Sequence, residues 1–241
     1  MRSKLLKISK EVVKRMTRYS PYDLSFYRQP GPKHLESLII QITKDIGAKR
    51  VLDVGAGSGW LVKALRKNNI NAYGCDNSKL AIKKNLVVWA NATKLPFEPK
   101  KFNLITAISL IEHLTPAKAD KFLAEVKRTL KPRGFLFLVT PNFASPLKLI
   151  QGKKWHGYHD STHINFYTPS SLKKTLRKNG FGHFQTTFPA PSGENFEWTL
   201  PTVIKNLPKP IKKILNFLAY STFLNRLKNS FSILAQVNET K

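Results

Sequence analysis

A glycine-rich turn between an apolar run and an amphipathic segment constrains this chain more than any other feature. The run at 51–54 has the residue types of a short buried strand, and the turn at 55–59, which reads Gly-Ala-Gly-Ser-Gly, follows it directly. Glycine allows unusual backbone dihedral angles and lets a ligand approach closely. A helix predicted at about 60–68 presents its N-terminal N–H groups to the same place. The stretch therefore predicts a ligand-binding turn at the carboxyl end of a strand.

The rest of the chain alternates between short apolar runs and helical stretches. The runs predicted as strands are 50–54, 71–75, 86–90, 102–108, 134–139, 181–188 and 231–237. The stretches predicted as helices are 4–16, 33–47, 60–68, 78–84, 116–129 and 169–179. Strand, helix and strand repeated in this order favour an α/β fold with a doubly wound, parallel sheet.

The domain organisation follows from length and composition. With 241 residues, 41% hydrophobic and 23% charged, the chain fits one globular domain and is not a disordered polymer. We expect a helical cap at 1–47, a binding core at 48–189 and 231–238, and a helical insertion at 190–230. The insertion either packs on the sheet or on a partner subunit, or it forms a lid over the binding site.

The glycine turn does not match the dinucleotide-binding pattern G-x-G-x-x-G, because its third glycine would fall on Trp60. Asp53 precedes the first glycine, and a carboxylate there disfavours a pyrophosphate but suits a ligand with ammonium and sulfonium groups. Asp76 follows the next strand, 23 residues after Asp53. A carboxylate at that strand end can accept hydrogen bonds from both hydroxyl groups of a ribose, each contributing about 1.5–3 kcal/mol. The alternative role for Asp76 is a helix cap.

These residues resemble the motifs of the class I S-adenosylmethionine-dependent methyltransferases, in particular the small-molecule branch with the ubiquinone-biosynthesis O-methyltransferases. The resemblance covers about 48–189 and the last strand. It implies a Rossmann-like, seven-stranded sheet whose last strand is antiparallel, and S-adenosyl-L-methionine as cofactor. The residues that it places at the cofactor are Asp53, Gly55, Ala56, Gly57, Gly59, Asp76, Asn77, Asn91, Ala92 and Ser109.

Two positions depart from that family's usual pattern. Asn91 stands where the family usually has aspartate; the resemblance implies that it accepts a hydrogen bond from the adenine amino group, which an amide oxygen also does. The Ala92 N–H would reach a ring nitrogen. Arg133 replaces a glycine in the turn at 130–134, so we expect the backbone to differ there.

Two histidines are candidates for the base that takes a proton from the methyl acceptor. His113 follows the strand at 102–108 within Glu112-His113, which resembles O-methyltransferases that hold a divalent metal with these two residues and an acid three positions earlier. That earlier position is Ser109 here, so we predict no metal. His113 is equally well explained as a structural histidine that bonds the loop backbone.

His163 belongs to a second polar and aromatic segment, 155–168, which resembles an Asp-x-Thr-His segment of many relatives. Three histidines lie within eight residues there, but loop-like spacing and the lack of a cysteine partner argue against zinc. We consider His163 a candidate base, and Asp160 either orients a histidine or caps a turn. The acceptor is expected to be a small molecule, a glycan or a lipid-linked compound.

The charge is strongly positive, with 41 Lys and Arg against 14 Asp and Glu, or +27. Because 31 of the basic residues are lysine and they spread along the whole chain, a dedicated nucleic-acid reader is not favoured, although an RNA methyltransferase stays an alternative, as does a non-catalytic cofactor-binding protein. The basic amphipathic segments 1–18 and 204–228 either face solvent or contact an anionic membrane. A single cysteine, Cys75, and no long apolar run suggest a cytoplasmic protein, with membrane association left open.

Overall fold

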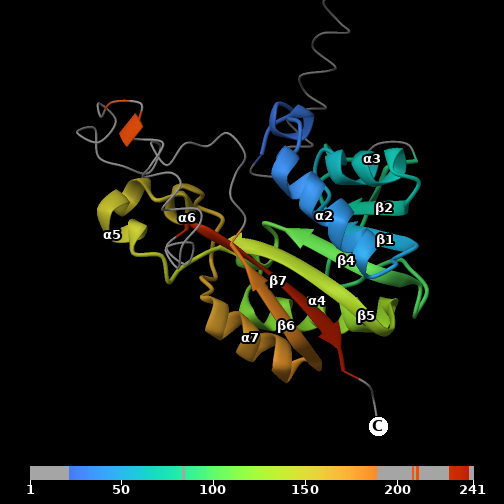
Figure 1. Ribbon diagram of the computed structural model, residues 1–241. Coiled ribbons are helices and arrows are strands. Elements are labelled where there is room, and N and C mark those ends of the chain that lie inside the picture. Colours follow the sequence, from blue (N-terminus) through green and yellow to red (C-terminus); the bar gives the residue numbers. More distant parts are fainter. Residues whose placement is uncertain (1–21, 83–84, 189–207, 209, 212–227, 239–241) are drawn as a thin grey trace, which may run out of the picture.

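The computed structural model describes residues 22–82, 85–188, 208, 210–211 and 228–238, and these form one mixed sheet with helices on both faces. Its seven strands lie in the order β3-β2-β1-β4-β5-β7-β6 (Figure 1). In chain order they are β1 (Arg50–Val54), β2 (Asn71–Asp76), β3 (Val87–Trp89), β4 (Phe102–Ile108), β5 (Leu130–Pro141), β6 (Phe181–Thr187) and β7 (Ser230–Val237). Strand β7 runs antiparallel to β5 and β6, which confirms the predicted doubly wound sheet with an antiparallel last strand.

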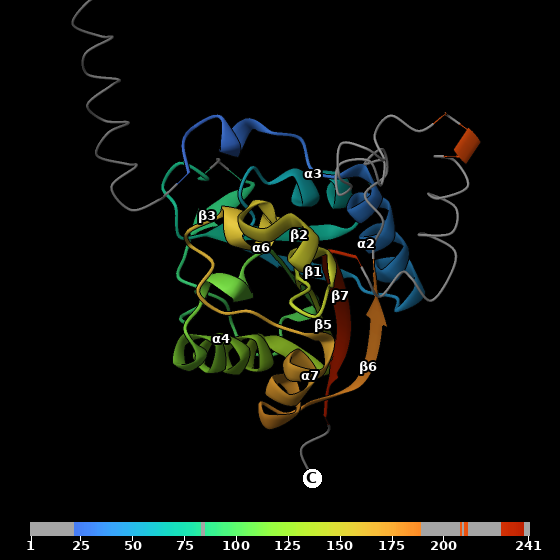
Figure 2. The same cartoon turned by 90° about the vertical axis from the view of Figure 1, so that its left-hand side faces the viewer.

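Four long helices cover the sheet. Helices α2 (Lys33–Asp45) and α3 (Trp60–Lys67) lie on one face, and α4 (Pro116–Thr129) and α7 (Pro169–Lys178) lie on the other (Figures 1 and 2). The starts of α4 and α7 follow from sequence, because each has a threonine cap followed by proline. Thr115 accepts the Lys118 N–H group, and Thr168 forms a capping box with Ser171.

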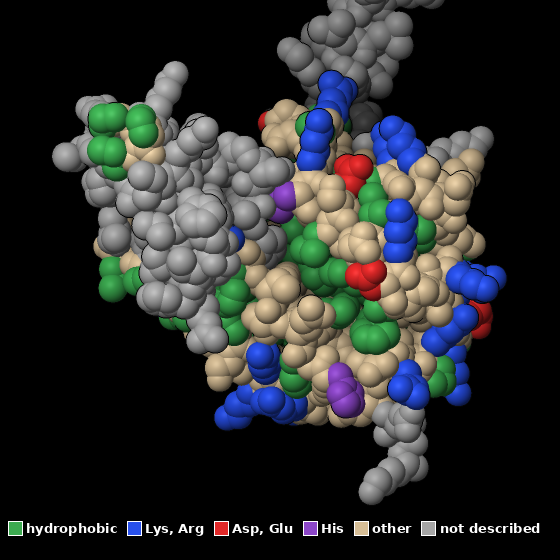
Figure 3. Space-filling view, in the orientation of Figure 1, with side chains coloured by type: hydrophobic (Ala, Val, Ile, Leu, Met, Phe, Trp, Pro, Cys, Tyr) green, Lys and Arg blue, Asp and Glu red, His purple; other side chains and the backbone are tan. Residues whose placement is uncertain are grey.

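The lysine and arginine side chains are distributed over the visible face of the molecule and do not gather in one patch (Figure 3). Between them lie few acidic side chains, as the composition requires. Within the part of the chain that the structure describes, no helix is long and apolar enough to cross a membrane.

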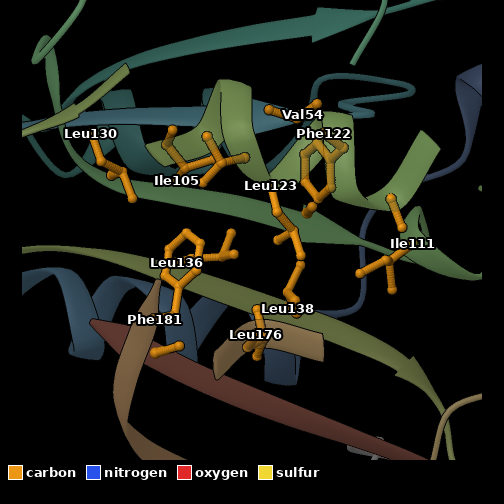
Figure 4. Close-up of a cluster of buried hydrophobic side chains, with 14 of the residues drawn as sticks. Val54, Ile105, Ile111, Phe122, Leu123, Leu130, Leu136, Leu138, Leu176 and Phe181 are labelled. Atoms are coloured by element: carbon orange, nitrogen blue, oxygen red, sulfur yellow. The ribbon is translucent and has the colours of Figure 1, made fainter. Parts of the chain in front are cut away.

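The core has two halves, one on each face of the sheet. On the α4 and α7 face, Phe122, Leu176 and Phe181 pack against the apolar side chains of β1, β4 and β5 (Figure 4). On the other face, Ile39 of α2 and Leu65 of α3 are fully buried. Central strands that are buried on both faces read as nearly continuous apolar runs, which is why they were visible in the sequence.

The helix predicted at 78–84 is wrong, because the described residues 77–82 form turns. Asp76 Oδ1 accepts the Ser78 N–H group at 2.8 Å, and the Ser78 hydroxyl oxygen accepts the Leu80 N–H group at 3.3 Å. These local bonds offer the backbone an alternative to a helix, and a stretch this short cannot offset the cost of helix nucleation. Strand β3 is also shorter than the predicted 86–90.

Strand β5 begins earlier than the predicted 134–139, and its pairing with β4 changes register between Phe102 and Leu104. Arg133 lies in this irregular part with φ +58°. The position thus keeps the left-handed conformation that favours glycine, although the residue is arginine.

Several short helices were not predicted: η1 (Phe26–Arg28), η2 (Ile111–His113), α5 (Leu147–Gln151), η3 (Gly152–Lys154) and α6 (His156–His159). Helices of one turn show no periodicity in sequence. Helices α5 and α6 lie beyond the carboxyl end of β5 (Figure 1). The predicted helix 4–16 and most of the insertion 190–230 lie outside the described residues.

Candidate active site

The carboxyl ends of β1, β2 and β4 lie side by side, and they bring together the polar residues that follow these strands. Strand β1 pairs in parallel with β2 on one side and with β4 on the other. Asp53 lies opposite Thr106 of β4, and its Oδ1 accepts the Thr106 hydroxyl proton at 2.7 Å. Open parallel sheets bind ligands at this edge, where the connections from neighbouring strands leave in opposite directions.

The glycine turn closes onto Asp76. The Gly57 N–H group donates to Asp76 Oδ2 at 2.9 Å, and Gly55, Gly57 and Gly59 all have positive φ values of 75°, 49° and 71°. A Cβ atom at Gly59 would lie 2.7 Å from a methyl carbon of Leu86. Both the backbone conformation and the close packing therefore require glycine at the start of α3.

Two buried carboxyl groups lie at this edge, and burial makes each of them harder to ionise. Burial, and then the charge of Asp76, raise the pKa of Asp53 to about 7, while the hydrogen bond from Thr106 lowers it. Burial also raises the pKa of Asp76, and the N–H groups of Ser78 and Gly57 oppose this shift. A ligand with positive charge would be favoured here, as the sequence analysis expected.

Other residues expected at the cofactor lie in this turn or follow β2 and β3, and of these Asn91 and Ala92 are the ones expected at the adenine ring. Asn77 and Asn91 are exposed, Ala92 is half-buried and Ala56 is buried. The Asn91 amide oxygen accepts the N–H and hydroxyl groups of Thr93, both at 2.9 Å, so its two lone pairs are already used. To accept a hydrogen bond from an adenine amino group, the Asn91 oxygen would have to lose one of its hydrogen bonds from Thr93. The role of Asn91 at the adenine ring stays a prediction.

Trp89 was not singled out in the sequence. It ends β3 with 60% of its surface exposed, and its indole N–H donates to the Asn77 carbonyl oxygen at 3.0 Å. An exposed aromatic ring beside Asn77 is a group on which a flat base can stack. The feature of the sequence that could have identified Trp89 is an aromatic residue near the end of a predicted strand.

Ser109 marks the end of β4. It is exposed and has φ +49°, while its N–H group donates to the Val139 carbonyl oxygen at 2.9 Å. A serine in the left-handed region costs conformational energy, and such positions cluster at functional sites.

His113 follows on the short helix η2 and is held by Thr162. Its Nδ1 lies 2.8 Å from the Thr162 hydroxyl oxygen and 3.2 Å from the Thr162 carbonyl oxygen. Burial, and then the nearby His163 ring, lower the pKa of His113, whereas Asp160 and the carbonyl groups of Thr162 and Ser109 raise it. The net shift is downward, so the imidazole is neutral near pH 7 and can accept a proton.

The fold brings the second candidate histidine next to the first. The ring centroids of His113 and His163 are 4.7 Å apart. His163 Nδ1 lies 2.9 Å from the Gly157 carbonyl oxygen, and its Nε2 lies 3.8 Å from Asp160 Oδ2. Sequence reasoning had identified the two residues separately and could not show that they share one site.

Glu112 completes this cluster, because ligand atoms of Glu112, His113 and His163 all lie within 4.8 Å of one another. Two imidazoles and a carboxylate form a donor set that transition metals bind. Burial raises the pKa of Glu112 to about 7, although the bond from Thr140 lowers it. Two ligand atoms that each lie about 2.1 Å from one ion are at most ~4.2 Å apart. Ligand atoms separated by the full 4.8 Å would therefore have to move closer together to bind one ion. The absence of a metal stays a prediction.

Tyr22 was missed by the sequence analysis and covers the histidines from the N-terminal segment. Its hydroxyl group donates to Asp160 Oδ2 at 2.6 Å, and its ring meets His113 edge-on at 6.4 Å between centroids. Phe26 stacks on Tyr22 at 4.3 Å, and a Cβ atom at Gly57 would lie 4.0 Å from the Phe26 ring. The segment therefore extends from the glycine turn to the histidines.

An aromatic cluster adjoins His163. Phe143, Trp155, Tyr158 and Phe166 contact one another with centroid distances of 4.9–6.4 Å. Gly157, which holds His163, lies between Trp155 and Tyr158 in the chain. The site thus combines an acid-lined turn, two adjacent histidines and an apolar wall.

Comparisons with known proteins agree with this geometry. A family model described as "Methyltransferase domain" matches residues 24–184. A ubiquinone biosynthesis O-methyltransferase of Thiobacillus denitrificans is 28% identical over 156 residues, covering 56% of this chain and 65% of that protein. One from Coxiella burnetii is 29% identical over 169 residues, covering 62% of this chain and 70% of that protein. The alignment with the Thiobacillus protein spans slightly less than two thirds of that relative's length.

A solved structure shares the fold. The crystal structure of a SAM-dependent methyltransferase from Archaeoglobus fulgidus superposes with a TM-score of 0.59 at 23% sequence identity. The match covers 83% of this chain and 94% of that one.

Proposed function

This chain belongs to the methyltransferase-domain family, and from that premise we propose that it transfers a methyl group from S-adenosylmethionine to an oxygen atom of its acceptor. The observation that carries the proposal is the Gly57–Asp76 hydrogen bond, which fixes the glycine turn and a buried carboxylate at adjacent strand ends. Asp53 adds a second buried carboxyl group beside them.

The residues present fit this cofactor. Asp76 offers carboxylate oxygens at the end of β2, beside the glycine turn 55–59, and this supports its role as acceptor for the ribose hydroxyl groups. The buried acids favour a ligand with a positive charge. When bound, the cofactor supplies a methyl group on a positively charged sulfur, and transfer breaks that carbon–sulfur bond with its electron pair staying on sulfur. The protein's own contribution is to orient the acceptor in line with this bond and to take its proton.

The acceptor class is inferred from the other half of the site. His113 and His163 are the candidate bases for an acceptor hydroxyl group, and the aromatic cluster at 143–166 suits an apolar or aromatic acceptor. The relatives named as ubiquinone biosynthesis O-methyltransferases support oxygen as the methylated atom. We therefore propose a small-molecule or lipid-linked acceptor. A glycan fits the aromatic cluster less well, because it is less apolar.

Two other functions fit parts of the observations. The net charge of +27 favours polyanions and so keeps RNA as an alternative acceptor. A cofactor-binding protein without turnover would keep the turn and Asp76 but would need no base. Both are distinguished by the experiment below.

Calorimetric titration with S-adenosylmethionine tests the cofactor site. We expect wild type to bind and Asp76→Asn to bind roughly ten- to a hundredfold more weakly, because hydrogen bonds to a charged group are lost. Asp45→Asn, at an exposed residue at the end of α2, is the matched control and should bind like wild type. No binding by wild type would refute the proposal.

The same proteins, supplied with cofactor carrying a labelled methyl group, identify the acceptor class. We expect label in the lipid and small-molecule fractions of a host extract and none in RNA. Label only in RNA would overturn the proposed acceptor, and binding without any transfer would indicate the non-catalytic protein.

A further inference from the structure

The hydroxyl group of Thr162 links His113 to Asp160, and its single proton decides how the histidine is protonated. Thr162 Oγ1 lies 2.5 Å from Asp160 Oδ1 and 2.8 Å from His113 Nδ1. Asp160 is a carboxylate and only accepts, so the threonine proton goes to Asp160. The threonine oxygen must then accept from His113, which places the imidazole proton on Nδ1. The Thr162 carbonyl oxygen, 3.2 Å from the same nitrogen, is a second acceptor for that proton.

Asp160 is held in its ionised form by this arrangement. Burial opposes ionisation, but the hydrogen bonds from Thr162 and Tyr22 outweigh it and lower the pKa of Asp160 to about 2. The Thr162 N–H group also donates to Oδ1 at 2.8 Å, and the Tyr22 hydroxyl group donates to Oδ2. Both carboxylate oxygens are therefore fixed, one of them from the N-terminal segment.

We propose that Asp160, acting through the Thr162 hydroxyl group, is a positioning residue that holds His113 with its proton on Nδ1, so that His113 Nε2 is the base for the acceptor. This inference rests on the proposed methyl transfer to oxygen. It extends that function by assigning the base to one of two adjacent histidines and by naming the residues that orient it.

The step balances with this one base. The acceptor O–H bond breaks and its proton bonds to His113 Nε2, while the oxygen uses its electron pair to bond the methyl carbon. The carbon–sulfur bond breaks with its pair going to sulfur, which becomes neutral. The imidazolium then lies against the ionised Asp160 across Thr162, and it later returns the proton to water.

His163 is placed differently, although its Nδ1 also carries a proton, donated to the Gly157 carbonyl oxygen. Its Nε2 faces Asp160 at 3.8 Å, and only 9% of its side chain is exposed. Both of its ring nitrogens therefore already face a protein group, Gly157 on one side and Asp160 on the other. The titratable groups that face His113 are Tyr22, Glu112, Asp160 and His163, and of these Asp160 is the group held ionised at neutral pH by its hydrogen bonds.

Nuclear magnetic resonance on histidine-labelled protein without cofactor or acceptor tests the tautomer directly. We expect the His113 signals of wild type to show a protonated Nδ1 and an unprotonated Nε2. Asp160→Asn should lower the pKa of His113, because a negative charge that favours the imidazolium is removed. Asp120→Asn, at a half-buried aspartate paired with Lys178, is the matched control and should leave the His113 signals unchanged. A wild-type proton on Nε2 would overturn the proposal.

Turnover gives the second readout. We expect Asp160→Asn and Thr162→Val each to lower kcat on the order of 10- to 100-fold while the cofactor Kd and the acceptor KM stay near wild type. The double variant should lose no more than either single variant, because both interrupt the same link. Thr162→Ser, which keeps the hydroxyl group, should restore the rate, and Thr175→Val on α7 is the control.

The outcomes separate this inference from the proposed function. Additive losses, or an unchanged His113 pKa in Asp160→Asn, would refute the positioning role even if methyl transfer is found. The expected tautomer in a protein that methylates no acceptor would refute the function and leave the assignment of the His113 proton standing.

Discussion

At the scale of single residues, the site owes its chemistry to carboxyl groups that the fold buries. Asp53 is 3% exposed and Glu112 is 1% exposed, and burial raises the pKa of each to about 7. Glu112 Oε2 accepts the Thr140 hydroxyl proton, whereas Oε1 is buried without a hydrogen-bond partner among the described residues. A buried carboxyl group that lacks hydrogen-bond donors for both oxygens is more stable protonated than ionised.

Glu112 should therefore make the protein less stable as pH rises. Between about pH 4.5 and 7 the unfolded chain has lost this proton while the folded protein still holds it, so deprotonation favours unfolding. Glu112→Gln stays neutral, and its free energy of unfolding relative to wild type should rise across this range by up to about 3 kcal/mol. Urea denaturation at several pH values measures this difference.

The matched control for that substitution is Glu98→Gln, because Glu98 is exposed. Comparing each variant with wild type cancels the contribution of the histidines, whose lowered pKa values act in the opposite direction. A pH-independent difference between Glu112→Gln and wild type would mean that Glu112 is ionised in the folded protein throughout.

At the scale of elements, the strands follow from local sequence, and the irregular segments between them do not. The start of β5 is an example, since Arg133 adopts a left-handed conformation that its neighbours impose through the register shift against β4. The sequence indicated that this turn departs from the family pattern, but only the paired strands show that Arg133 keeps the left-handed backbone conformation, which is strained for a residue other than glycine.

Arg133→Gly should stabilise the protein by about 0.5–1 kcal/mol, because it removes the left-handed strain at an exposed residue. Lys131→Gly in the same strand has no such strain to relieve and should destabilise by a similar amount through backbone entropy. Both values come from urea denaturation. Equal losses in the two variants would show that the Arg133 side chain contributes more than its conformation costs.

The short helices and the segment at 22–31 mark the limit of prediction at this scale. No periodic pattern in these residues could place Tyr22 on Asp160. The failed helix at 78–84 has the same cause, because side-chain bonds from Asp76 and Ser78 decide that turn locally.

At the scale of the whole molecule, a net charge of +27 coexists with a candidate site that is rich in acidic residues. Lysine and arginine spread over the visible face, whereas Asp53, Asp76, Glu112 and Asp160 gather at the strand ends. The positive excess is thus separate from the proposed cofactor chemistry. Its role in binding depends on the basic segments 1–18 and 204–228. The first lies outside the described residues, and of the second only 208, 210–211 and 228 are described.

Flotation with vesicles tests whether the basic segments contact an anionic membrane or face solvent. We expect wild type to float with vesicles containing phosphatidylserine at low salt and to be released at high salt, since the attraction is screened. Deletion of 204–228 should reduce flotation, with unchanged cofactor binding as the check on folding, and phosphatidylcholine vesicles are the control. Equal flotation of wild type and the deletion would show that this segment does not contribute to membrane binding.

The sequence by itself determined the order of the strands and long helices, the glycine turn and the carboxylates at the ends of β1 and β2, because each of these features depends on a short, local run of residues. Tertiary structure decided that Thr162 links His113 to the ionised Asp160, and that burial raises the pKa of Asp53 and of Glu112. Contacts such as Tyr22 to Asp160 and His113 to Thr162 join residues 138 and 49 positions apart. They exist because the connections after β4 and β5 and the N-terminal segment meet at one edge of the sheet, and burial there then shifts the pKa of the groups they carry.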